Sequence, residues 1–208
     1  MKYKVLILLI IVSCISCKQK NQLNYYSIFN DDLAELREGD LAFRKGRGTA
    51  TRFVNLADKN TVFSHVGILV KNTAGNWFVI HAVPGEQEET GGKEMLKIDS
   101  VNIFFSSDRA TAGAIYRLPL SLEKSQKIAE ESTRLLEKEI YFDHSFNTED
   151  TTQLYCTELI HFIFTKVGED ITEGKRHTIP AFKYELIFPS DILKNEKLIE
   201  ICNFKDIK

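Results

Sequence analysis

Cys156 is the residue of this 208-residue chain best placed to act as a nucleophile. It follows a polar stretch and opens the apolar segment 156–167, whose spacing predicts a buried helix that ends at Gly168. Unpaired backbone N–H groups and the dipole at the start of such a helix favour an anion, so we expect a lowered pKa for this thiol. The backbone N–H of Cys156 can also donate to the oxyanion of a tetrahedral intermediate.

A nucleophilic cysteine needs a base, and imidazole is the usual one. The chain offers five histidines, at positions 65, 81, 144, 161 and 177. His65 and His81 lie in two segments rich in β-branched residues on either side of the polar turn 72–76, and this pattern predicts a β-hairpin. If the hairpin pairs tightly, His81 can orient His65 as the third member of a triad orients the base.

The same residues have ordinary structural explanations. A lone cysteine at the edge of an apolar helix is more often a small buried hydrophobic residue than a nucleophile. A disulfide between Cys156 and Cys202 is a further alternative, because the amino terminus indicates an oxidising compartment. At this level the catalytic and the structural interpretations both stay open.

Metal and cofactor sites are not predicted. Glu158 and His161 form a single Glu-x-x-His pair, whereas a di-iron bundle needs two such pairs and further glutamates on long helices. The single Cys-x-x-Cys, at Cys14 and Cys17, has no second such pair to complete a zinc site, and the sequence has no His-Glu-x-x-His motif. We therefore expect chemistry carried by side chains alone.

The first residues are typical of a targeting segment. Two lysines precede an unbroken apolar run over 5–12, which predicts a secretory signal peptide and is too short to span a bilayer. Small residues then lead to Cys17, and also to Cys14, in a pattern that resembles the lipobox of bacterial lipoproteins. We expect removal of residues 1–16 and lipidation of Cys17, with Cys14 as the alternative and an unlipidated secreted protein as the other possibility.

This start implies a location and a partner. Residues 17–24 are a polar tether, and a single domain over 25–208 would be held at a membrane of the bacterial cell envelope, facing the periplasm or the cell surface. Composition is that of a globular chain, with 43% hydrophobic and 27% charged residues. A net charge of −2 gives no basic field to attract nucleic acid, so we expect no such partner; the oligomeric state stays open.

The elements that must position these side chains follow from hydrophobic spacing. Segment 25–36 has a helical or irregular pattern, 141–153 is a loop, and the tail beyond 168 shows few clear elements. Helices are predicted at 49–58, 121–138 (with Ser121 as N-cap) and 156–167, and strands at 40–44, 65–70, 77–83, 95–103 and 114–117. Strands followed by helices indicate one α+β domain.

Four motifs in a fixed order carry a family resemblance: LREGDL at 36–41, SHVGI at 64–68, VIHA at 79–82 and YCTELI at 155–160. Together they resemble the YiiX/YebB-like branch of the NlpC/P60 superfamily. The resemblance implies a circularly permuted papain-like fold, with a small antiparallel sheet packed against helices, one of which carries the nucleophile at its N-terminus. In this permuted branch the histidine precedes the cysteine, as it does here.

The resemblance also implies roles for single residues. Cys156 would be the nucleophile, His65 the general base and His81 the third polar residue, where many relatives have an acidic one. Asp40, in the Gly-Asp motif, would shape a turn. Glu158 and Tyr155 would contact the substrate or support the structure.

The function implied is that of a cysteine peptidase or amidase that cleaves an amide through a thioester. Peptide-like substrates are implied, including cell-wall peptide links and amides of lysine. Two alternatives stay open: a thiol-dependent acyltransferase or esterase acting on lipid, as in permuted relatives of the lecithin:retinol acyltransferase type, and an inactive surface binding module.

Overall fold

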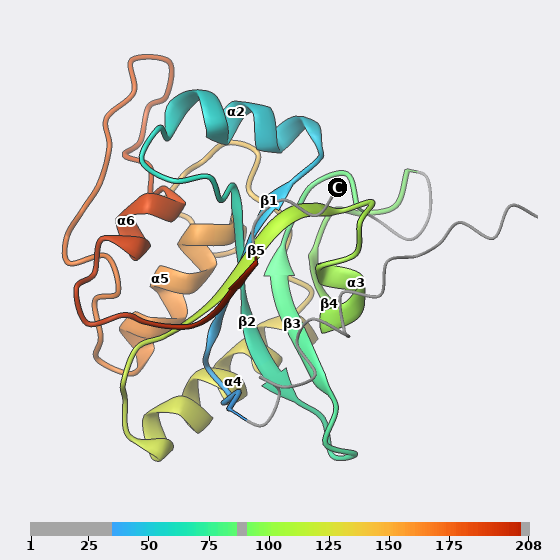
Figure 1. The fold of residues 1–208 in the computed structure, drawn as a ribbon. Coiled ribbons are helices and arrows are strands. Elements are labelled where there is room, and N and C mark those ends of the chain that lie inside the picture. Colours follow the sequence, from blue (N-terminus) through green and yellow to red (C-terminus); the bar gives the residue numbers. More distant parts are fainter. Residues whose placement is uncertain (1–34, 87–90, 205–208) are drawn as a thin grey trace, which may run out of the picture.

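A computed structural model describes residues 35–86 and 91–204, with one six-stranded antiparallel sheet in the order β4-β3-β2-β1-β5-β6 (Figure 1). The expected signal peptide, the lipidation sites Cys17 and Cys14, the tether and nearly all of segment 25–36 lie outside the described residues. The strands are β1 (Leu41–Gly46), β2 (His65–Lys71), β3 (Trp77–Ala82), β4 (Leu96–Ser100), β5 (Ala110–Arg117) and β6 (Ile199–Phe204). The helices are α2 (Thr49–Ala57), α3 (Val101–Phe104), α4 (Leu122–Glu137), α5 (Cys156–Lys166) and α6 (Pro189–Leu193).

The predicted hairpin is confirmed in β2 and β3, which pair antiparallel with Ile68 opposite Ile80. Gly75 closes the turn at φ 87°, a left-handed conformation that suits glycine. Alternate residues face opposite sides of the sheet. Val66 and Ile68 join the core under the helices, while the neighbouring Leu69 joins a second apolar cluster on the other face.

Helices α4 and α5 cover one face of the sheet, and α3 lies against the other (Figure 1). The Ser121 side chain accepts a hydrogen bond from the Lys124 N–H and caps α4, as predicted. The apolar face of α5 is fully buried in residues such as Leu159 and Phe164. Burial of each such side chain contributes about 1.5–3 kcal/mol, so packing fixes the helix that begins at Cys156.

The structure differs most from the sequence prediction in two places. The strand expected over 95–103 ends at Ser100, whose hydroxyl accepts from the Ile103 N–H and starts α3 instead. The tail is more ordered than expected, because Asp191 accepts from the Phe188 N–H at 2.8 Å at the start of α6 and β6 then pairs with β5. Across residues 35–86 and 91–204, no helix is long and apolar enough to cross a membrane.

Candidate active site

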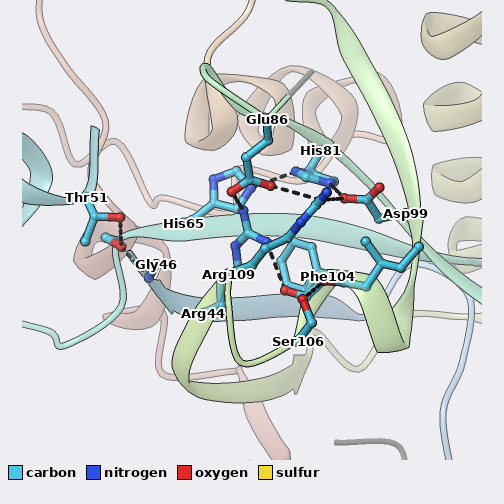
Figure 2. A network of polar contacts seen from close by, with 12 residues as sticks. Arg44, Gly46, Thr51, His65, His81, Glu86, Asp99, Phe104, Ser106 and Arg109 are labelled. Carbon is cyan, nitrogen blue, oxygen red and sulfur yellow. Dashed lines mark hydrogen bonds and ion pairs between the residues drawn. The ribbon is translucent and has the colours of Figure 1, made fainter. Parts of the chain in front are cut away.

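The structure brings His65 and His81 together. His65 begins β2 and His81 lies near the end of β3, and Nε2 of His65 is 2.9 Å from Nδ1 of His81 (Figure 2). Continuing the ladder by one residue places Gly67 opposite His81, where an added Cβ would be 2.9 Å from the His81 Cβ. Glycine at 67 therefore leaves the space in which the His81 ring reaches diagonally towards His65.

Asp99 extends this pair into a relay of three side chains. Its Oδ2 lies 3.1 Å from Nε2 of His81. A carboxylate only accepts, so Nε2 of His81 carries its proton and Nδ1 accepts from the Nε2–H of His65. The His65–His81–Asp99 relay thus leaves the lone pair of His65 on Nδ1, the form that a general base needs.

Sequence reasoning missed Asp99. Its available signal was an acidic residue inside a predicted strand, where aspartate is disfavoured unless it has partners. The structure supplies them: Arg109 Nη1 lies 2.6 Å from Oδ2 and Lys97 Nζ lies 3.2 Å from Oδ1. The carboxylate is buried, so these cations offset its lost hydration.

Arg44 lies next to the relay on β1, where its backbone is opposite that of His65 in the β1–β2 ladder. It is fully buried, with its guanidinium 4.5 Å from the centre of the Phe104 ring. Glu86 bridges Arg44 and Arg109, at 2.5 and 3.1 Å respectively (Figure 2). Two arginines and two carboxylates therefore surround the two imidazoles.

Both imidazoles are neutral at neutral pH. Burial lowers the pKa of His65 well below 6.5, and the charge of Arg44 lowers it further. Burial also lowers the pKa of His81 to about 4, against the opposing hydrogen bond to Asp99. Burial alone would raise the pKa of Asp99, but the hydrogen bond from His81 and the nearby cations lower it to about 2.

Cys156 is the first residue of α5, so its backbone N–H has no partner within the helix. It lines the same cleft as His65. The expected lowering of the thiol pKa is wrong: burial raises it to about 11. Backbone N–H groups of Val66, Thr157 and Cys156 act in the opposite direction without offsetting that burial. The thiol is therefore protonated at neutral pH, and the cleft that it lines also holds a neutral base.

Tyr155 and Glu158 support the start of α5. The Tyr155 hydroxyl accepts from the Ile187 N–H at 2.9 Å, and the Tyr155 N–H donates to the Glu158 carboxyl at 3.3 Å. Burial raises the pKa of Glu158 to about 8. Both side chains hold backbone around the nucleophile.

Asp40 lies in a turn before β1, away from the cleft-lining residues. Its carboxylate accepts two hydrogen bonds of 2.7 Å from Arg117 and one of 2.8 Å from the Arg37 N–H. The structure thus places Asp40 as a residue that shapes a turn.

The remaining candidates lie outside the relay. Cys156 and Cys202 do not form a disulfide with each other, so the alternative of such a disulfide is wrong. His161 contacts Arg176 at 2.9 Å and His177 contacts Asp191 at 2.7 Å. In the described part of the chain, no group of three or more His, Cys, Asp or Glu side chains could hold a metal ion.

Comparison with solved structures supports the fold. The crystal structure of metalloprotein yiiX from Escherichia coli O157:H7 superposes with a TM-score of 0.66 at 18% sequence identity, covering 81% of this chain and 98% of that one. Identity at this level shows the fold alone. Comparison with the curated proteins finds no match.

The sequence model of the family described as permuted papain-like amidase enzyme, YaeF/YiiX, C92, matches residues 35–186. The match spans β1 through the loop that precedes α6, and so contains both His65 and Cys156. The family comprises cysteine hydrolases that act on amides, and its fold is the permuted one expected from the sequence. This chain belongs to the permuted papain-like amidase family.

Proposed function

We propose that the protein cleaves an amide bond through a thioester on Cys156, with His65 as general base. The observation that carries this proposal is the His65–His81–Asp99 relay, which ends at the cleft that Cys156 also lines. A base held in one tautomer and a thiol at a helix start, both lining one cleft, are the groups that acyl transfer requires.

The neutral resting pair decides the order of proton transfer. As Sγ of Cys156 attacks the carbonyl carbon, its proton passes to Nδ1 of His65 and the carbonyl electron pair moves to oxygen. The Cys156 N–H donates to that oxyanion. Collapse breaks the C–N bond, and the imidazolium returns its proton to the leaving amine. Water then attacks the thioester carbonyl and gives a proton to His65. Collapse breaks the C–S bond and releases the acid, and the imidazolium returns its proton to the Cys156 thiolate.

His81 and Asp99 are positioning residues in this scheme. The Asp99 carboxylate fixes the proton on Nε2 of His81, and His81 in turn fixes the proton of His65 on Nε2. Neither residue needs to change its protonation during a turnover. Asp99 thus takes the orienting role that the sequence assigned to His81 alone.

We place the chain in the YiiX/YebB-like branch of the NlpC/P60 superfamily and its substrate among peptide-like amides, including cell-wall peptide links. The four ordered motifs support both assignments. We also propose a single domain over 25–208, secreted and anchored at the cell envelope by lipid on Cys17, or on Cys14. The sequence of residues 1–24 supports that location.

The test uses Cys156→Ala with Cys202→Ala as its matched control, because Cys202 is the other cysteine of the described chain and lies on the edge strand β6, outside the cleft lining. The two proteins are incubated with a panel of muropeptides and aminoacyl amides. We expect amine release by wild type and by Cys202→Ala, none by Cys156→Ala, and an acylated Cys156 peptide in wild type by mass spectrometry. Amine release by Cys156→Ala would overturn the mechanism.

Transfer of an acyl group to or from lipid without amine release would favour the acyltransferase alternative. This outcome is read from lipid extracts incubated with the same three proteins. Absence of any Cys156-dependent reaction would favour a binding module.

A further inference from the structure

We propose that the substrate group next to the scissile amide is large, uncharged and apolar. This inference rests on the proposed function, because it concerns the cleft that Cys156 and His65 line. The residues that would bind the group are Phe53, Phe146 and Phe182, here named the aromatic wall.

The aromatic wall is assembled from three distant segments: α2, the loop before α5 and the loop before α6. Ring centres lie 5.8 Å apart for Phe53 and Phe146, 5.5 Å for Phe53 and Phe182, and 5.2 Å for Phe146 and Phe182. All three side chains line the cleft and are only half-buried. Partly exposed aromatic rings that converge on one cleft mark a surface for an apolar ligand.

The aromatic wall is continuous with the nucleophile. The ring of Phe146 is 5.2 Å from that of Tyr155, the residue before Cys156. The cleft has a volume of about 570 Å³, within the usual range of about 300–1,000 Å³ for small-ligand sites. Its remaining apolar lining includes Val54, Val83, Pro84, Phe142, Leu186, Ile187 and Phe188.

The acidic side chains of the cleft are already paired. Glu86 bridges Arg44 and Arg109, and Glu94 accepts from the Gly85 N–H at 2.8 Å and contacts Nε2 of His144. A substrate ammonium group would have to compete with these partners. No such partner has to be displaced when an apolar group binds to the aromatic wall, so the cleft favours an apolar group over a lysine-like one.

The test uses iodoacetamides that differ only in the N-substituent, applied to the full chain. The substituents are methyl, butyl, hexyl, octyl, 3-phenylpropyl and 6-aminohexyl. The readout is the second-order rate of Cys156 alkylation by peptide mass spectrometry, with Cys202 as internal reference for unspecific affinity. We expect the rate at Cys156 to rise about two- to fourfold per methylene until the cleft is filled, because a fully buried methylene gives about fourfold.

Phe53→Ala and Phe182→Ala should flatten this dependence on chain length, so that the ratio of the octyl rate to the methyl rate falls towards one. Phe162→Ala is the matched control, since Phe162 is a half-buried phenylalanine of α5 outside the cleft lining. The linear and phenylpropyl arms distinguish an alkyl chain from an aromatic side chain as the natural group.

A comparison of hexyl with 6-aminohexyl in the wild-type protein needs no variant. A faster reaction of the aminohexyl probe would overturn the proposal in favour of cation–π binding of an ammonium. A rate at Cys156 that does not depend on chain length would overturn it as well. Failure of every probe to label Cys156 would instead contradict the proposed function, and the apolar site would fall with it.

Discussion

Nε2 of His65 lies 2.9 Å from Nδ1 of His81, so one imidazole orients the other. A neutral imidazole donates through one nitrogen and accepts through the other. The partner on one side of the ring therefore determines which nitrogen of the next ring carries the proton. Asp99 therefore sets the tautomer of His65 indirectly, through its hydrogen bond to His81. No hydrogen bond described for His65 joins it to Asp99 directly. The proposed base depends on a carboxylate two side chains away.

Replacement of Asp99 by asparagine should reduce turnover with little change in KM. The amide can donate to His81, which allows the opposite tautomer and places the proton of His65 on Nδ1, where the base is needed. We expect kcat to fall by about 10²–10⁴, the range of general-base catalysis. The measurement is steady-state hydrolysis of a substrate found in the amide panel.

Arg109→Gln is the control for this variant. It removes the 2.6 Å ion pair of Asp99 but keeps the carboxylate. We expect a fall in kcat of less than about tenfold. Equal losses in both variants would show that Asp99 acts only through the ion-pair network.

The acid limb of kcat/KM should lie below pH 6.5. Its cause is protonation of His65, whose pKa is lowered by burial and by Arg44. Arg44→Met removes a positive charge, so the pKa of His65 rises and the acid limb moves towards 6.5. The pH profile of kcat/KM checks both statements, with Arg134→Met, a distant arginine of α4, as control. An acid limb that stays in place in Arg44→Met would exclude this charge effect.

Gly67→Ala should damage both stability and the relay. The new methyl would lie 2.4 Å from Cγ1 of Val79 and 2.9 Å from Cβ of His81. We expect a loss of about 1–3 kcal/mol in the free energy of unfolding, together with reduced kcat. Gly48→Ala is the control for stability, because its Cβ would meet nothing within 4 Å; Gly48 is the N-cap of α2, so this change should cost no more than about 1 kcal/mol and leave kcat unchanged.

Glu158→Gln should stabilise the protein at alkaline pH only. Burial raises the pKa of Glu158 from 4.5 to about 8, so the folded protein keeps a proton that the unfolded chain loses above 4.5. The associated stability is present below pH 4.5 and is lost as pH rises through 8. Glutamine keeps the acceptor for the Tyr155 N–H and avoids this loss.

Thermal unfolding of both proteins at pH 4.5 and 8.5 measures the effect. The advantage of Glu158→Gln should be on the order of a few kcal/mol at pH 8.5 and close to zero at pH 4.5. The exposed Glu130→Gln is the control and should show no such difference. An advantage equal at both pH values would mean that ionisation of Glu158 is not its source.

The sequence correctly predicted those elements whose hydrophobic pattern lies within one short segment. Alternation and the polar turn predicted β2 and β3, and the apolar spacing after Cys156 predicted α5 with its start at the correct residue. Contacts between segments that are distant in the chain could not be predicted from such local patterns. Whether Asp99 faces His81 depends on the register of β3 against β4, which pairs His81 with Lys97.

The thiol pKa shows a second limit of sequence reasoning. The position of Cys156 at a helix start is visible in the sequence, but the desolvation of its thiol is a property of the packed chain. Helix dipole and burial act in opposite directions, and only the structure shows that burial dominates. The aromatic wall was missed for a similar reason, since Phe53 and Phe182 are brought together only by the tertiary fold.

The diagonal placement of His65, His81 and Asp99 on β2, β3 and β4 has a further consequence. A slip of one residue in either ladder would turn one member of the relay to the opposite face of the sheet. Hydrolytic competence thus reports on the alignment of three strands at once. A chain that has formed its sheet in a shifted alignment would retain most of its secondary structure and still be inert.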